Sequence, residues 1–244
     1  MKNVHKCLLA LLAAAMLLTG CGGKQEDVSG KVTPNEASPT AAPTSSVETV
    51  PEETEETPVS LGRIEGGVYT NTYAGFGCEL DSNWVFYSAE ELQALPGDVQ
   101  ELFADTEFGD AMSEMTQIMD MKAENANDLT VINVLYNQMD TQTRLLYAMM
   151  SEEDIADAML DQKDLLVSTY AQAGIEVSAM EKVEVDFLGE KHFAVRTSST
   201  WDGVPYFTLQ LFDYHAGRYS ITTTFSSYLE DKTDDMLDLF YKVD

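Results

Sequence analysis

The sequence predicts an α+β domain over residues 64–244, with an antiparallel sheet of about six strands flanked by helices. The strands are predicted from short runs of alternating apolar and polar residues, separated by tight-turn dipeptides. The helices are predicted from two N-terminal helix signals, at Ser88 and at Ser151, each followed by an amphipathic stretch. These observations define the fold class, and the elements follow in chain order.

The domain is expected to open with extended segments. Residues 68–73 are predicted to be extended as far as Gly75, which breaks the segment. Residues 76–80 alternate with the period of a half-buried strand, and Cys78 lies on its apolar face. We therefore interpret Cys78 as a core residue rather than a reactive thiol. A turn and another extended piece are predicted over 81–87.

One helix is predicted over residues 88–95. Ser88 and Glu91 have the spacing of a capping box, in which each side chain satisfies a backbone N–H of the other residue. The dipeptide Pro96-Gly97 is expected to end this helix, because proline lacks the N–H that the next turn needs. Residues 98–116 are predicted to form further short helices.

Three methionines, Met112, Met115 and Met119, follow a helical spacing in and after that segment. Thioether sulfur binds soft metals, so the stripe is one candidate for a metal site. Methionines at helical spacing also pack in cores or form adaptable contact surfaces. We favour core packing, and the sequence leads us to expect no metal and no cofactor.

A longer helix is predicted over residues 151–173, with acidic residues in its first turn and Gly174 as the cap after its last turn. Its predicted apolar face comprises Ile155, Met159, Leu166 and Tyr170. Three carboxylates, Asp157, Asp161 and Asp164, lie opposite or beside that face. Their spacing matches no calcium-binding loop, so we interpret them as a solvated surface.

The remaining pattern predicts strands. Residues 129–138 read as a buried strand with 119–123 as its hairpin partner. Four antiparallel strands then form a meander over 175–225, in which Asp202-Gly203 is a strong hairpin signal. A last short amphipathic helix is expected to begin near Glu230 or Thr233.

Charge and cysteine content restrict the function. Residues 64–244 contain 34 acidic and 9 basic side chains, a formal charge of about −25. Nucleic-acid binding is disfavoured, because phosphate neutralisation needs clustered lysine and arginine. After removal of the first 20 residues and modification of Cys21, Cys78 is the one thiol left, so an intramolecular disulfide is not expected.

Residues 1–20 are predicted to be a signal peptide. Lys2 and Lys6 precede an apolar run of 11 residues, 8–18, which is shorter than the roughly 20 that a spanning helix needs. The run ends in Leu18-Thr19-Gly20-Cys21, which resembles the lipobox of bacterial lipoproteins. This resemblance implies cleavage between Gly20 and Cys21 and a diacylglyceryl group on the Cys21 sulfur. A plain signal peptide with a chance cysteine is the alternative.

Residues 21–63 are predicted to be a disordered acidic linker rich in threonine, proline and glutamate. A flexible chain of this length spans about 35 Å. The mature chain carries 12 basic and 42 acidic side chains, a formal −30, which an anionic membrane surface repels. We therefore expect the lipid on Cys21 to hold the protein at the extracytoplasmic face of the cell membrane.

The opening Tyr69-x-Asn71, followed by Gly75-Phe76-Gly77-x-x-Leu80 and Trp84, resembles the start of PsbP/Mog1-like domains. Lipoprotein domains of unknown function in gut Firmicutes belong to this group. The chain departs from the pattern at 81–83, where proline and glycine are usual. Over residues 64–244 the resemblance implies an α/β/α sandwich around an antiparallel sheet. It implies no activity, and no site residue is carried over.

We find no catalytic motif of the G-x-S-x-G, P-loop or H-E-x-x-H type. His192 and His215 have no cysteine or histidine at metal-ligand spacing, so structural or surface roles are favoured. Trp84 and Trp201 are assigned to packing rather than to a carbohydrate or peptide groove.

The leading hypothesis is a non-enzymatic, surface-anchored binding or accessory module of the cell envelope. Its partner is expected to be an unknown envelope protein or small ligand, and its working surface a face of the sheet or a loop edge. The alternative is a carboxylate-based enzyme or a calcium-dependent ligand-binding protein. Such a site would be assembled only by folding and would show converging acids with raised pKa values.

Overall fold

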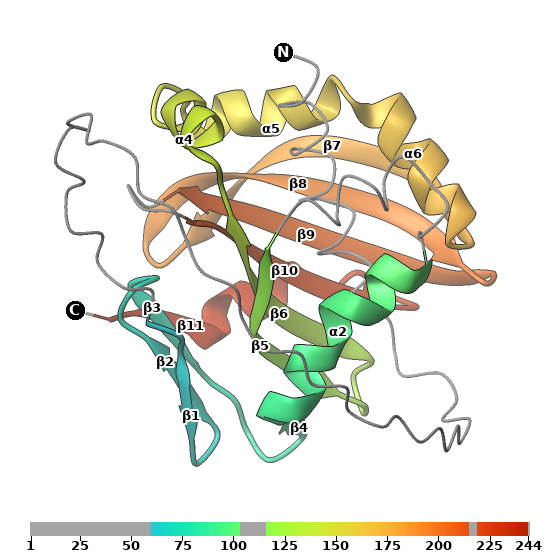
Figure 1. Ribbon diagram of the computed structural model, residues 1–244. Helices are drawn as coiled ribbons and strands as arrows, with labels where there is room; N and C mark the ends of the chain where they lie inside the picture. The colour runs from blue at the N-terminus through green and yellow to red at the C-terminus, as the bar shows by residue number, and fades with distance from the viewer. Residues whose placement is uncertain (1–59, 103–115, 215–218, 244) are drawn as a thin grey trace, which may run out of the picture.

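A seven-stranded antiparallel sheet is the central layer of the computed structural model, which describes residues 60–102, 116–214 and 219–243 (Figure 1). Its strand order is β4-β5-β6-β10-β9-β8-β7. These strands are β4 (Trp84–Phe86), β5 (Gln117–Asn125), β6 (Thr130–Gln138), β7 (Ile175–Phe187), β8 (Glu190–Trp201), β9 (Val204–Tyr214) and β10 (Tyr219–Tyr228). The predicted α+β fold with an antiparallel sheet is confirmed, with seven strands in place of about six.

Four helices within the described residues cover one face of this sheet: α2 (Ala89–Leu102), α4 (Thr141–Tyr147), α5 (Glu152–Leu160) and α6 (Lys163–Gln172). Helix α2 packs on β5, and α5 and α6 lie over the β7 side of the sheet (Figure 1). In the strand order, β6 and β10 lie between β5, which α2 contacts, and strands β9, β8 and β7, which α5 contacts.

A smaller four-stranded sheet covers the opposite face, with the order β1-β2-β3-β11. Its strands are β1 (Arg63–Glu65), β2 (Val68–Asn71), β3 (Phe76–Glu79) and β11 (Phe240–Lys242), and the 3-10 helix η1 (Asp234–Leu239) precedes β11. The sandwich therefore has three layers, and the second outer layer is built mostly of strands. Phe76, Phe187, Phe225 and Phe240 interlock between the two sheets with ring centroids 5.4–6.2 Å apart.

Within the described residues, the predicted strands are found in their predicted places. Cys78 is fully buried in β3, as its alternation indicated. The β5–β6 hairpin and the four-stranded meander are both present. Asp202 (φ 51°) and Gly203 (φ 80°) both have positive φ, which is the conformation of a type I′ hairpin turn.

The helix beginning at Ser88 has the predicted capping box, but its predicted end is wrong. Glu91 Oε2 accepts from the Ser88 backbone N–H (2.7 Å), and Ser88 Oγ accepts from the Glu91 N–H (3.4 Å). The helix then continues through Pro96-Gly97 to Leu102. Proline removes one hydrogen bond but has a φ compatible with a helix, and packing against β5 outweighs the local preference.

The single helix predicted over 151–173 is two helices. The capping box at Ser151 and Asp154 begins α5, and the chain breaks at Asp161 and Gln162 before α6 begins. The predicted apolar face is confirmed, since its four side chains are 0–2% exposed. Because the chain bends at this break, the apolar faces of both α5 and α6 contact the sheet. A single straight helix would extend beyond the strands. Helix α4, capped by Asp140, was not predicted because it is only seven residues long.

The C-terminal segment also differs from the expected amphipathic helix. Residues 234–239 form a 3-10 helix, and Phe240 then begins β11, which pairs with β3 opposite Cys78. Met236 and Leu237 of this 3-10 helix are buried. Tertiary pairing with β3 therefore decides the conformation of the last residues.

Candidate functional site

The residues predicted to carry the anchor, Gly20 and Cys21, lie outside the described part of the chain, as does the linker up to residue 59. Signal cleavage and lipidation therefore stay predictions. His215, Met112 and Met115 also lie outside the described residues. Among the described helices, none is both long and apolar enough to cross a bilayer.

The helix-facing side of the central sheet has an unexpectedly polar interior. On β10, Ile221 and Phe225 face the small sheet, so the alternate residues face the helices. Those alternate residues are Ser220, Thr222, Thr224 and Ser226, and all four are buried. A central strand buried on both faces is normally apolar on both. Buried polar side chains are therefore the informative feature of this sheet.

The strand register places further buried polar side chains beside those of β10, on the neighbouring strands. One lateral row contains Lys122 on β5, Asn133 on β6, Thr224 on β10 and Gln210 on β9, paired in that order. The next row contains Glu124, Ser226, Thr208 and Thr197, with Val131 between the first two. We call these eight polar residues the polar rows. All except Glu124 are 0–1% exposed.

Only part of the hydrogen-bonding capacity of the polar rows is used. Gln210 Nε2 donates to Thr224 Oγ1 at 3.4 Å, and the Tyr206 hydroxyl lies 3.4 Å from Ser226 Oγ. Thr197 Oγ1 and Thr208 Oγ1 have no partner among the described residues. A buried polar atom without a hydrogen bond costs about 1–3 kcal/mol, so these two hydroxyls need an explanation.

Helix α6 contributes a third such hydroxyl from above the sheet. The Tyr170 side chain is fully buried, and its OH has no partner among the described residues. Burial raises the pKa of Tyr170 far above its usual range, and the neighbouring Tyr206 raises it further. Tyr206 lies two residues before Thr208 on the same side of β9, so Tyr170 lies next to the polar rows.

A partly buried ion pair lies at the β5 end of the polar rows. Lys122 Nζ is 3.0 Å from Glu124 Oε1 and 4.3 Å from the ring centroid of Tyr87. The Tyr87 hydroxyl donates to the same Glu124 oxygen at 2.5 Å. The ammonium and the carboxylate neutralise each other, so the polar rows carry no net formal charge.

An aromatic group lies beside the polar rows, where Tyr228 and Tyr206 form the next same-face pair along β10 and β9. The ring centroids of Trp201 and Tyr206 are 5.5 Å apart, and those of Tyr206 and Tyr228 are 4.9 Å apart. Tyr206 is fully buried, whereas Trp201 and Tyr228 are half-buried. The prediction that Trp201 packs on the core is confirmed, and Trp84 packs on the small-sheet side.

Hydroxyls, amides and aromatic rings can bind a polar molecule, but they supply no nucleophile activated by a base. The polar rows contain no histidine or cysteine, and their carboxylate, Glu124, is held by Lys122 and Tyr87. The chemistry of this surface is therefore hydrogen bonding. The sequence analysis missed it, although the serine and threonine content of residues 219–228 could have indicated it.

A second polar cluster joins the two sheets. Asp120 lies at a bulge of β5 and is 6% exposed. Its Oδ2 accepts from the Tyr69 hydroxyl and from Asn71 Nδ2, both at 2.6 Å, and its Oδ1 accepts from the Gly62 N–H at 2.7 Å. Burial raises the pKa of Asp120, while these donors act to lower it. Its oxygens are used within the fold, so we assign Asp120 to structure.

The other predicted candidates occupy structural or surface positions. Burial raises the pKa of the Cys78 thiol to about 12, which fits a core residue. His192 Nδ1 lies 3.0 Å from Glu152 Oε1 at the edge of α5. Asp157 pairs with Lys182, and Asp161 and Asp164 are exposed. Met119 lies in β5, not in a helix, and packs in the core.

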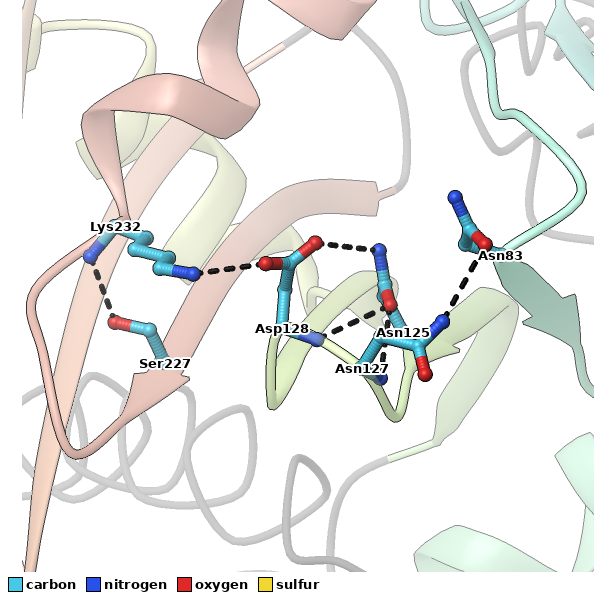
Figure 2. Close-up of polar contacts among 6 residues, drawn as sticks. All are labelled: Asn83, Asn125, Asn127, Asp128, Ser227 and Lys232. Atoms are coloured by element: carbon cyan, nitrogen blue, oxygen red, sulfur yellow. Dashed lines mark hydrogen bonds and ion pairs between the residues drawn. The ribbon is translucent and has the colours of Figure 1, made fainter.

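The loop between β5 and β6 contains the asparagine and aspartate side chains that often bind cations. Its side-chain oxygens instead accept hydrogen bonds from other groups of the protein (Figure 2). Asn125 Oδ1 accepts from the backbone N–H of Asn127 and of Asp128, and Asn127 Nδ2 reaches Asn83 Oδ1 at 3.3 Å. Lys232 Nζ is 2.8 Å from Asp128 Oδ1 and lowers the pKa of that carboxyl. Within residues 60–102, 116–214 and 219–243, no group of three or more histidine, cysteine or acidic side chains is placed to hold a metal.

We expect calcium to leave the stability of the domain unchanged. The Lys232 ammonium already neutralises Asp128, so the loop offers a metal little uncompensated charge. The Tm measured with millimolar CaCl₂ should agree within about 1 °C with the Tm in EDTA, because a ligand stabilises only when it binds the folded state. A larger upward shift that Asp128→Asn removes would contradict this expectation and favour the calcium-dependent alternative.

Comparisons with known proteins find similarity among solved structures alone. No family model and no curated protein matches the chain. Among solved structures, the chain is similar to the solution structure of cyanobacterial PsbP (CyanoP) from Synechocystis sp. PCC 6803. The TM-score is 0.40 at 12% identity, covering 79% of this chain and 99% of the cyanobacterial one. Nothing about the function of this chain follows from that likeness.

Proposed function

We propose that this protein is a lipid-anchored lipoprotein of the extracytoplasmic face of a cell membrane, whose domain is a non-enzymatic binding or accessory module. The observation that carries the proposal is the string Leu18-Thr19-Gly20-Cys21 at the end of an apolar run of 11 residues. A run of that length is typical of a signal peptide, and a thiol is the group that accepts the diacylglyceryl chain.

Electrostatics makes the lipid necessary for membrane attachment. The mature chain has a formal charge of −30, and an anionic membrane surface repels such a chain. Two acyl chains supply stable anchoring, whereas one chain gives only marginal binding. The linker then separates the membrane from β1, which begins at Arg63. The resemblance of the domain opening to exported lipoprotein domains supports the same location.

The polar rows support the binding role of the domain. They place hydroxyl, amide and aromatic groups together on one face of the sheet, with hydroxyls that have no partner among the described residues. Convergent hydrogen-bonding groups next to aromatic rings are typical of small-molecule sites. A ligand admitted to this face of the sheet would therefore meet hydrogen-bonding groups rather than reactive ones.

The anchor is tested by the Cys21→Ser variant of the full chain. We expect the wild-type protein in the membrane fraction, with a diacylglyceryl mass on the N-terminal peptide that begins at Cys21. The variant should lack this mass and should appear in the medium or periplasm. The matched control is Cys7→Ser, which changes a thiol that is lost with the signal peptide. A wild-type protein without lipid on Cys21, or a cleaved variant that stays in the membrane, would contradict the proposal.

A further inference from the structure

One end of the central sheet exposes apolar side chains at turns, where polar residues normally meet water. Leu129 ends the β5–β6 loop, Val204 follows the β8–β9 turn and Leu229 follows β10. Their side chains are 39%, 39% and 58% exposed, respectively. Trp201 and Tyr228, at the ends of β8 and β10, are half-buried. We call these five residues the apolar patch.

Backbone pairing makes the apolar patch continuous. Three pairings connect its members: the Tyr228 N–H donates to the Leu129 carbonyl (3.0 Å), the Leu229 N–H donates to the Pro205 carbonyl beside Val204 (2.9 Å), and Trp201 pairs with Val204 in the register of β8 and β9. The ring of Tyr206 lies between those of Trp201 and Tyr228. Single apolar residues on a surface are ordinary, whereas a continuous group of them marks an interaction site.

The two leucines have a costly backbone conformation. Leu129 (φ 54°) and Leu229 (φ 69°) both lie in the left-handed region, which favours glycine and asparagine. Leu229 is also the centre of a γ-turn, because the Glu230 N–H donates to the Tyr228 carbonyl at 2.9 Å. A γ-turn with positive φ is rare and strained. Glycine would relieve this strain and expose less apolar surface, so folding stability does not explain the leucines, and strain of this kind points to function.

An ion pair fixes the two leucine-bearing segments relative to each other (Figure 2). Lys232 Nζ is 2.8 Å from Asp128 Oδ1, and the Lys232 backbone N–H donates to Ser227 Oγ at 3.1 Å. Asp128 precedes Leu129 directly, and Lys232 lies three residues after Leu229. A surface that is ordered before binding loses less conformational entropy when a partner docks.

The charges around the apolar patch select the partner. Asp202 lies in the turn before Val204, Glu230 and Asp231 follow Leu229, and all three carboxylates are exposed. The ammonium of Lys232 is already neutralised by Asp128. A second copy of this chain would bring the same carboxylates against these, and an anionic membrane would repel the acidic domain. A surface with lysine or arginine around an apolar centre is complementary.

We propose that the apolar patch docks a partner protein through a segment that carries apolar side chains between lysine or arginine residues. This inference rests on the binding role proposed above and does not depend on the lipid anchor. The apolar centre supplies most of the affinity, as in other protein interfaces. The acidic rim steers and orients the basic segment.

The test is calorimetric titration of the purified full chain with three synthetic peptides of equal length. The first peptide has a core of leucine and phenylalanine between lysines. The second has the same core between glutamates, and the third has a serine core between lysines. We expect the first peptide to bind and the other two not to bind, because both the apolar centre and the basic flanks are required.

The double variant Leu129→Asn/Leu229→Asn should weaken binding of the first peptide at least about tenfold, because it removes the apolar centre. Its formal charge equals that of the wild type, so the general attraction of an acidic domain for a basic peptide is unchanged. The matched control is Leu145→Asn/Leu165→Asn, which removes exposed leucines (66% and 47%) from α4 and α6. The control should keep the wild-type affinity.

The Tm of the Leu129→Asn/Leu229→Asn variant separates a folding defect from a binding defect. Asparagine tolerates positive φ, so this Tm should equal or exceed that of the wild type. A lower Tm would assign the two leucines to packing and would contradict the proposal.

Three further results would overturn the proposal. The first is no binding of the lysine-flanked apolar peptide, and the second is equal affinity for it in the wild type and the Leu129→Asn/Leu229→Asn variant. The third is a dimer in sedimentation velocity that this variant abolishes, because the apolar patch would then bind a second copy. The lipid on Cys21 is measured separately by the mass of the N-terminal peptide, so failure of docking and failure of the anchor are distinguishable.

Discussion

Replacing Asp120 by alanine is expected to destabilise the domain by about 3 kcal/mol, or roughly 10 °C in Tm. The change removes the acceptor of three donors, namely the Tyr69 hydroxyl, the Asn71 amide and the Gly62 N–H. Each buried donor left without a partner costs about 1–3 kcal/mol, although Asn71 Nδ2 still donates to the Tyr136 hydroxyl at 2.6 Å. We take the low end, because burial raises the pKa of Asp120 and its removal relieves some desolvation. The free energy of unfolding from urea titration is the measurement.

The matched control is Glu181→Ala, which removes an exposed strand carboxylate that makes no hydrogen bond described above. Its free energy of unfolding should stay within about 0.5 kcal/mol of the wild type. If Asp120→Ala were no more destabilising than this control, the two sheets would be joined by apolar packing alone. The role assigned to Asp120 would then be wrong.

Replacing Gly77 by alanine is expected to cost about 3 kcal/mol, through a clash rather than a lost bond. A Cβ built at this position would lie 2.6 Å from the Tyr69 backbone oxygen and 2.9 Å from the Tyr241 ring. The Tyr241 side chain is 39% exposed and can move aside. The Tyr69 carbonyl belongs to β2, which is paired with β3 at Gly77, so it moves only if the small sheet distorts. Thermal or urea unfolding measures the loss.

Gly189→Ala is the control variant for Gly77→Ala. Gly189 has φ 78° and open space around its Cβ position, so alanine there meets only backbone strain of about 1 kcal/mol. Gly77→Ala should therefore be clearly more destabilising than Gly189→Ala. The reverse order would show that the small sheet adapts easily, and would contradict the close approach of β2 and β3.

Local sequence signals predicted where α2 and α5 begin, but they did not predict where these helices end or break. The capping boxes at Ser88 and Ser151 formed because their hydrogen bonds involve residues three apart. The end at Pro96-Gly97 and the unbroken helix over 151–173 were wrong, because packing against the sheet decides where those helices stop or bend. Phe240 likewise joins a strand because β3 is there to pair with it.

Local sequence patterns could not predict clusters of side chains that come from several strands. Tyr69 and Asn71 were noticed as an opening motif, but their partner Asp120 is 51 and 49 residues away, at a bulge that no spacing rule reveals. The polar rows draw on five strands, and each strand alone has only a few serines, threonines or amides. Register makes them neighbours, and register depends on the whole sheet.

The sequence by itself determined the α+β class, the hairpin meander, the buried Cys78 and the predicted anchor string at Leu18 to Cys21. These follow from interactions between residues close in the chain, or from composition alone. Only the tertiary structure decided that Asp120 joins two sheets and that eight polar side chains share one buried face. Burial and lateral pairing are properties of the packed sheet, because they depend on residues that the chain brings together only when it folds.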